Sequence, residues 1–173
     1  MPFFCTSMKR ISASIMCCDP PDPRPAVKNE CRHSAIMPVL VFGAVNVHDG
    51  DTVAVVHQEE SANATAFLDF LRLLKERHPN RMIALVLDNA RIHHARMVKD
   101  FLREEGQCFH FLYLPPYSPQ LNPIERLWKW LKDTVITNAF HKDRHEILQA
   151  VQRLIHYIPK RPEDVLRRLE CAV

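Results

Sequence analysis

An acidic residue stands at a position where the sequence pattern favours chemistry. Asp88 directly follows the apolar run 82–87, which is typical of a strand buried on both faces. Open α/β sheets bind their ligands at the carboxyl ends of their strands, so a carboxylate at this point is well placed for a functional role. Asp88 and Asn89 are also common turn residues, and for a lone Asp the turn is the more frequent explanation.

A second acid, Glu125, lies at the start of an expected helix. Asn122 as N-cap, Pro123 at the first helical position and Glu125 two positions later form a capping arrangement that needs no function. Glu125, Lys129 and Lys132 nevertheless share one helix face, so that one acid stands beside two bases. The expected buried stripe lies on another face and comprises Ile124, Leu127, Trp128, Leu131 and Val135.

These two acids fit metal-dependent phosphodiester chemistry. Such chemistry needs carboxylates from different elements, because hard oxygen ligands hold two divalent cations about 3.5–4 Å apart. Asp88 and Glu125 are separated by 36 residues and can meet if the helix lies across the sheet. The lysines behind Glu125 would then hold a phosphate backbone, and a third carboxylate is expected.

The surrounding pattern predicts the elements that position both acids. Four apolar or β-branched runs predict strands, the first two forming a hairpin around the turn 48–51: Val39–Val47, Thr52–His57, Met82–Leu87 and Cys108–Leu114. Five amphipathic segments predict helices, the first capped by Ser61: residues 61–77, 94–105, 123–137, 143–157 and 162–170. Together they predict one α/β domain with a mixed sheet flanked by helices.

The composition agrees with a globular protein and excludes several classes. The chain has 173 residues, a net charge of +3 and 47% hydrophobic residues. Its longest nearly apolar run, residues 35–47, is interrupted by Pro38 and Gly43 and is shorter than the ~20 residues that a membrane span needs. Four of the six cysteines lie within the first 31 residues, unlike an even disulfide framework, so we expect a cytoplasmic protein.

The sequence resembles a known enzyme family in three motifs. Residues 87–93 read LDNARIH, residues 114–125 read LPPYSPQLNPIE, and Leu127-Trp128 follow. These motifs resemble the second-Asp and Glu motifs of the DDE transposases of bacterial insertion sequences related to mariner elements. The resemblance extends from about Phe42-Gly43 to about residue 158, and the order of elements is similar to that family's ribonuclease-H-like fold.

The resemblance implies a transposase that cuts and joins DNA with Mg²⁺ or Mn²⁺ in a two-metal site. Asp88 would be the second metal-binding acid and Glu125 the third. Asn89 and His93 would support these acids without binding the metal themselves. Candidate DNA contacts are Arg126, Lys129 and Lys132. The implied partners are transposon ends and target DNA, together with a second copy of the chain or a full-length transposase.

The amino-terminal part departs from the family. The family's first Asp lies on the central first strand, upstream of the glycine matched by Gly43, yet no Asp here precedes Asp19. We expect residues 1–36, which are rich in Pro and Cys, to be a poorly ordered, truncated or frame-shifted start, and residues 37–173 to form the catalytic domain. The first, central strand would be missing or replaced. Ile11–Cys17 could fill the gap, which would make Asp19 a weak candidate for the first acid.

Three functional hypotheses follow. The first is a transposase catalytic domain that shows little or no cleavage because it lacks the first acid. The second is a non-catalytic remnant that binds DNA or a full-length transposase. The third is a ribonuclease-H-like nuclease outside transposition, which would need Asp19 or Asp22 as its first acid.

Overall fold

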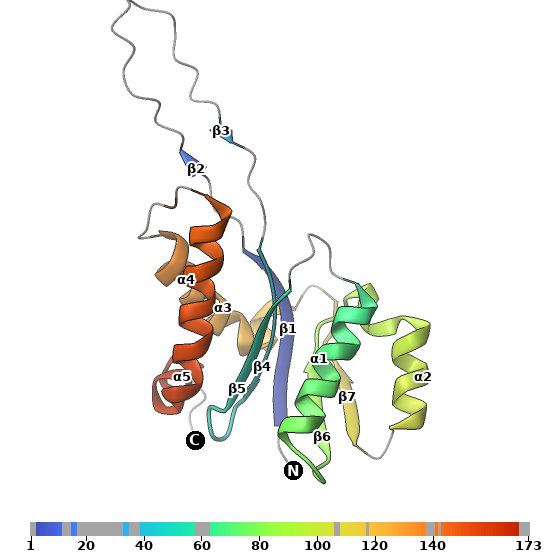
Figure 1. Cartoon of the computed structure of the whole chain (residues 1–173). Coiled ribbons are helices and arrows are strands. Elements are labelled where there is room, and N and C mark those ends of the chain that lie inside the picture. The colour runs from blue at the N-terminus through green and yellow to red at the C-terminus, as the bar shows by residue number, and fades with distance from the viewer. Residues whose placement is uncertain are drawn as a thin grey trace, which may run out of the picture.

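The protein folds around one five-stranded mixed sheet (Figure 1). The computed structural model describes residues 3–11, 15–16, 33–34, 39–57, 63–105, 108–116, 118–137, 141 and 143–169. The strand order is β5-β4-β1-β6-β7, with β4 antiparallel to both neighbours and β1, β6 and β7 parallel to one another. The strands are β1 (Phe3–Ile11), β4 (Val39–Asn46), β5 (Thr52–His57), β6 (Ile83–Leu87) and β7 (Phe109–Tyr113).

The central strand is present, which corrects one expectation from the sequence. Residues 3–11 occupy the place that we expected to be empty or filled by Ile11–Cys17, and they pair with β4 on one side and with β6 on the other. Ile15–Met16 (β2) instead pair with His33–Ser34 (β3) in a separate two-stranded sheet. Asp19 and Asp22 lie outside the described residues, and the predicted domain boundary near residue 37 stays a prediction.

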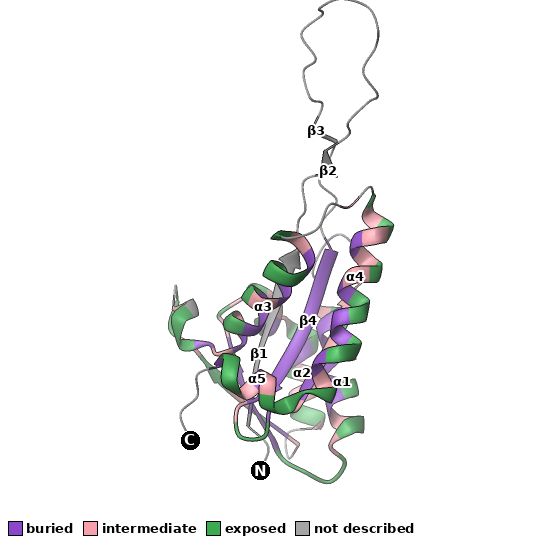
Figure 2. Cartoon of the chain, turned by 90° about the vertical axis from the view of Figure 1, so that its left-hand side faces the viewer, coloured by how far each residue is buried: buried purple, intermediate pink, exposed green. Residues whose placement is uncertain are grey.

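Strand β4 shows how the sheet is buried on both faces. All of its residues are buried, and their side chains alternate between two hydrophobic clusters. Val39, Val41 and Val45 pack on one face with α3, α4 and α5, while Leu40 and Phe42 pack on the other with α1. Figure 2 shows β4 coloured as buried. A strand that is covered on both faces has a continuous apolar sequence, and the run of β4 predicted this.

The helices form two layers. One layer holds α1 (Ala64–Arg77) and α2 (Arg96–Glu104), and the other holds α3 (Ile124–Lys132), α4 (Arg144–Tyr157) and α5 (Pro162–Leu169) (Figure 1). A π-helical turn, η3 (Asp133–Thr137), extends α3, so the predicted helix 123–137 is confirmed. All five residues of its predicted stripe are buried.

Two helix starts differ from the sequence expectations. Asn63, not Ser61, caps α1, since its Oδ1 accepts a hydrogen bond from the Ala66 N–H at 2.7 Å; Ser61 lies outside the described residues. At α3 the cap position is Pro123 and carries no side-chain cap bond, while the backbone carbonyl of Asn122 accepts from the Glu125 N–H at 3.0 Å. The Asn122 backbone, rather than a capping box, therefore begins this helix.

Strand β7 is an edge strand of the sheet and is not buried as predicted. Leu112 and Tyr113 are about two-fifths exposed, and only Phe109 of this strand is fully buried. An edge strand has one open side and needs less apolar cover than a central strand, so a mostly apolar sequence does not guarantee burial.

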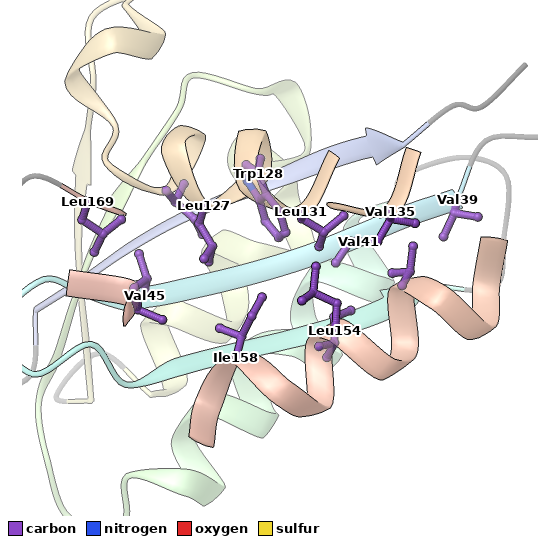
Figure 3. Close-up of a cluster of buried hydrophobic side chains, with 14 of the residues drawn as sticks. Val39, Val41, Val45, Leu127, Trp128, Leu131, Val135, Leu154, Ile158 and Leu169 are labelled. Atoms are coloured by element: carbon purple, nitrogen blue, oxygen red, sulfur yellow. The ribbon is translucent and has the colours of Figure 1, made fainter. Parts of the chain in front are cut away.

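Gly43 and Trp128, two residues of the recognised motifs, are direct packing partners. A Cβ at position 43 would lie 2.5 Å from Cη2 and 2.7 Å from Cζ2 of Trp128. Figure 3 shows Trp128 and the neighbouring Leu127 and Leu131 of α3 directed at β4, within the cluster that also receives Leu154 of α4. The missing side chain at Gly43 is what lets α3 approach the sheet this closely.

Candidate active site

Asp88 directly follows the carboxyl end of β6, the strand between the central β1 and the edge strand β7. The last β6 residue, Leu87, pairs with Thr6 of β1, so Asp88 is level with Ser7 of the central strand. The Asp88 side chain is 46% exposed, which leaves its carboxylate accessible from solvent. In the structure Asp88 therefore lies at the end of a buried strand, as predicted.

His93 holds the backbone and the side chain of Asp88 together. Its Nδ1 lies 3.0 Å from the Asp88 carbonyl oxygen and 3.2 Å from Asp88 Oδ1. A carbonyl oxygen only accepts hydrogen bonds, so Nδ1 carries the proton. The ring is 2% exposed and packs against the Phe67 ring with centroids 4.5 Å apart.

Burial lowers the pKa of His93 below its ordinary value, although the Asp88 carbonyl and carboxylate act in the opposite direction. The ring is therefore neutral at pH 7. A neutral, buried imidazole positions the carboxylate without neutralising it, so Asp88 keeps its negative charge available for a cation. The Asp88 Oδ1 also accepts a hydrogen bond from the Ala90 N–H at 3.3 Å.

A polar and aromatic cluster lies beside Asp88, and of its members the sequence indicated Asn89 but neither His94 nor Tyr113. Asn89 is exposed, and its Oδ1 lies 2.6 Å from His94 Nε2. The His94 ring stacks on the Tyr113 ring at 4.6 Å, and the Tyr113 hydroxyl donates to the His93 carbonyl at 3.4 Å. Because Tyr113 is on β7, 20 residues after His93, only the parallel pairing of β6 and β7 brings the two together.

Glu125 begins α3 on the same side of the sheet that Gly43 leaves open. Ile124, the residue before it, has its Cδ1 3.5 Å from the place of a Cβ at Gly43. Gly43 pairs with Ser7 of β1. The first turn of α3 therefore lies over the same segment of the central strand that is level with Asp88.

The start of α3 and Asp88 thus lie near the same segment of β1, the first next to Gly43 and the second at the end of β6. Gly43 and Asp88 are separated by two interstrand spacings, about 10 Å along the sheet, with Ser7 between them. Among the described strands, β1 is the one that lies between β4 and β6. The strand reads FFCTSMKRI and contains neither Asp nor Glu.

The donor set fits a hard divalent cation only in part. Asp88 and Glu125 offer carboxylate oxygens, which Mg²⁺ and Mn²⁺ prefer. Within the described part of the chain, however, no group of three or more His, Cys, Asp or Glu side chains is close enough to hold a metal ion. Asp88 and Glu125 therefore fit the carboxylate chemistry of such a site, and the described residues bring no third acid to them.

The three candidate DNA contacts differ in their settings. Arg126 donates a hydrogen bond from its guanidinium to the Leu169 carbonyl at the end of α5, so part of its role is structural. Lys129 and Lys132 are exposed, and neither forms an ion pair among the described residues. Their charges are therefore available to a ligand.

Comparison with known proteins identifies the family to which this fold and these residues belong. The model of the family described as DDE superfamily endonuclease matches residues 17–148. This chain belongs to the DDE superfamily endonucleases. The matched region begins downstream of β1, so the family signal rests on the segments that contain Asp88 and Glu125, and the central strand lies outside it.

Curated relatives of this DDE endonuclease chain include one insertion-element protein. It is 31% identical over 103 residues to the "Insertion element IS630 uncharacterized 39 kDa protein" of Shigella sonnei, covering 59% of this chain and 30% of that protein. It is 40% identical over 37 residues to the "Uncharacterized protein y4pE/y4sA" of Sinorhizobium fredii (strain NBRC 101917 / NGR234), covering 21% of this chain and 27% of that one. The alignments span less than a third of either relative.

Solved structures show the same fold. The catalytic domain of Mos1 mariner transposase superposes with a TM-score of 0.59 and 15% identity, covering 97% of this chain and 82% of that one. A Mos1 transposase paired-end complex with the left transposon end gives 0.61 and 17%, covering 98% and 56%. The predicted ribonuclease-H-like α/β fold of this DDE endonuclease chain is confirmed. Across the described residues no helix is long and apolar enough to span a membrane.

Proposed function

We propose that this chain is the catalytic-domain part of an insertion-sequence transposase whose DNA cleavage and strand-transfer chemistry depends on Asp88 and Glu125, and that the chain as it stands has little or no such activity. The observation that carries this proposal is the composition of β1. Its segment between the two acids is Thr6-Ser7-Met8, so the site has two carboxylates where two-metal chemistry needs more ligands.

The proposed metal is Mg²⁺ or Mn²⁺. Carboxylate oxygens favour these cations, and solved Mos1 catalytic-domain structures are described with Mn and with Mg. A bound cation would supply charge for the phosphoryl oxygens and the attacking oxygen. The residues of this chain would do the rest: His93 holds Asp88, Asn89 is held by His94, and the backbone bond from Glu125 to Asn122 fixes the start of α3.

The proposed partner is DNA, in the form of transposon ends and target, and the proposed location is the cytoplasm. Mos1 relatives are described in complexes with transposon ends. Arg126, Lys129 and Lys132 would contact phosphates on the helix that carries Glu125. A second copy of this chain, or a full-length transposase, would complete the assembly.

A gain-of-function variant tests the proposal directly. Ser7 pairs with Gly43 of β4, which contacts the start of α3, and is level with Asp88 at the end of β6. A carboxylate introduced by Ser7→Asp would therefore stand between Asp88 and Glu125. We expect the natural chain not to nick supercoiled plasmid above background with Mn²⁺, and Ser7→Asp to nick it in a Mn²⁺-dependent reaction.

Controls separate chemistry from folding. Ser7→Asn is the isosteric control and should stay inactive, and Asp88→Asn in the Ser7→Asp background should abolish the gain. Far-UV circular dichroism of each variant checks the fold. Robust nicking by the natural chain that disappears in Asp88→Ala would show that the inactivity proposal is wrong, and the same nicking surviving Asp88→Ala would remove the site.

The absence of an acid from β1 also favours a second candidate function, a non-catalytic remnant that binds DNA or a full-length transposase. This candidate predicts that the chain co-purifies with a co-expressed full-length relative and that Glu125→Ala leaves this binding unchanged. Loss of binding in Glu125→Ala would argue against it.

A further inference from the structure

A cleft lined by basic side chains lies between α3 and α5. Its volume is about 590 Å³, and its cationic lining residues are Arg126, Lys129, Arg167 and Arg168. Two acids, Asp133 and Asp164, also line this α3–α5 cleft, which leaves an excess of two positive charges from four cations and two anions. A concave surface with unbalanced positive charge attracts polyanions.

The acidic residues do not neutralise the cleft. Asp164 lies between two guanidinium groups, with Arg161 at 3.7 Å and Arg167 at 3.6 Å, so one carboxylate is shared by two cations. Lys129 forms no ion pair with any described residue. Positive charge therefore remains on both walls of the α3–α5 cleft.

Two of the arginines are held in place before any ligand binds. The guanidinium carbon of Arg168 lies 4.1 Å from the centroid of the Trp130 ring, and Arg126 is bonded to the Leu169 carbonyl. Stacking occupies the face of a guanidinium group and leaves the N–H donors at its edge available, which is the geometry that binds phosphate. Side chains that are already ordered lose less entropy on binding.

Helix α3 carries both Glu125 and one wall of the cleft. Lys129 is four residues after Glu125, one turn further along the helix on the same face. We propose that the α3–α5 cleft binds the sugar-phosphate backbone of a DNA duplex whose strand reaches Glu125. This inference rests on DNA being the substrate class of the proposed function, and the presence of Glu125 on the same helix, one turn from Lys129, favours DNA over an acidic peptide.

The test compares two charge-matched double variants of the full chain. Lys129→Gln/Arg168→Gln removes one cation from each wall of the cleft, whereas Arg96→Gln/Lys99→Gln removes two exposed cations from α2, on the opposite face of the sheet. Binding of a fluorescent duplex is followed by anisotropy with EDTA present, at several salt concentrations.

Each lost phosphate contact reduces the slope of log affinity against log salt by about 0.9. The slope measured for Lys129→Gln/Arg168→Gln should therefore be smaller in magnitude by about 2. The ratio of its dissociation constant to that of the natural chain should fall about tenfold between about 50 and about 200 mM salt. The α2 variant should match the natural chain.

Equal slopes and affinities for the cleft variant and the α2 variant would overturn the proposal. So would poly-glutamate that competes as well as unlabelled duplex at equal charge, since the cleft would then be an acidic-peptide surface. Asp88→Asn should leave duplex binding intact, because the cleft needs no metal. Retained binding together with an inactive Ser7→Asp variant would therefore count against the proposed chemistry and not against the cleft.

Discussion

The contact between Gly43 and Trp128 gives the sharpest prediction about this fold. Gly43→Ala places a methyl group 2.5 Å from Cη2 of a ring that is 2% exposed and enclosed by the cluster of α3, α4 and α5. Neither partner can move freely, because Gly43 is in the middle of β4 and the Trp128 ring is fully packed. Overpacking of this kind costs about 1–3 kcal/mol.

A double-mutant cycle isolates this clash from other effects. The atoms nearest to the added methyl group, Cη2 and Cζ2, belong to the outer ring of the indole, which phenylalanine lacks. In a Trp128→Phe background, Gly43→Ala should be neutral or should stabilise by up to about 1 kcal/mol, since glycine in a strand interior is less favourable than alanine by about 0.5–1 kcal/mol. The coupling between the two substitutions is therefore about 1–4 kcal/mol and favours the double variant.

Urea unfolding followed by far-UV circular dichroism measures all four proteins without relying on tryptophan fluorescence. Gly43→Ala should lower the free energy of unfolding in the natural background and not in Trp128→Phe. An equal cost in both backgrounds would mean that the ring does not press on β4, and the argument that Gly43 lets α3 approach the sheet would then be wrong.

Three further substitutions have defined outcomes. Gly50→Ala should destabilise by at least about 1–2 kcal/mol in urea unfolding, because Gly50 has φ of 74° and its added Cβ would collide with the Pro162 carbonyl; an unchanged midpoint would contradict this. Asp143→Ala should cost about 1 kcal/mol by removing the N-cap of α4, and a loss below a few tenths would refute the cap. Burial holds the pKa of His93 in the folded chain below the unfolded value of about 6.5. As the pH falls, the unfolded chain therefore binds a proton at this ring before the folded chain does. The free energy of unfolding that is present above about pH 6.5 is then lost, by at most about 1.4 kcal/mol per pH unit. With EDTA present, thermal unfolding between about pH 7.5 and 5.5 should show a shallower pH slope for His93→Gln than for the natural chain, while a control His110→Gln keeps the natural slope; equal slopes for both variants would contradict the buried neutral ring.

Sequence patterns predicted the helices and strands in which buried and exposed positions follow a regular spacing along the chain. The buried stripe of α3 and the continuous apolar runs of β4 and β6 follow from a helix packed on one face and from strands packed on both. Asp88 could be located because strand ends are visible as the end of an apolar run. The DDE motifs then linked Asp88 and Glu125, and the family match covers both.

The central strand could not be predicted because its evidence is not local. Residues 3–11 mix Cys, Thr, Ser, Lys and Arg and precede a Pro-rich stretch, so their own pattern is weak. They are a strand in the structure because β4 and β6 offer open backbone groups on either side, and an unfilled gap would leave both edges without hydrogen bonds.

The sequence by itself determined the family, the order of most elements and the two acids, because each depends on residues close together in the chain. Only the tertiary structure decided that Gly43 faces Trp128, that Tyr113 supports the turn after Asp88, and that a strand without a carboxylate runs between β4 and β6. Those contacts join residues that lie tens of positions apart in the chain. They depend on strand pairing and side-chain packing, and the local spacing of apolar residues does not predict either.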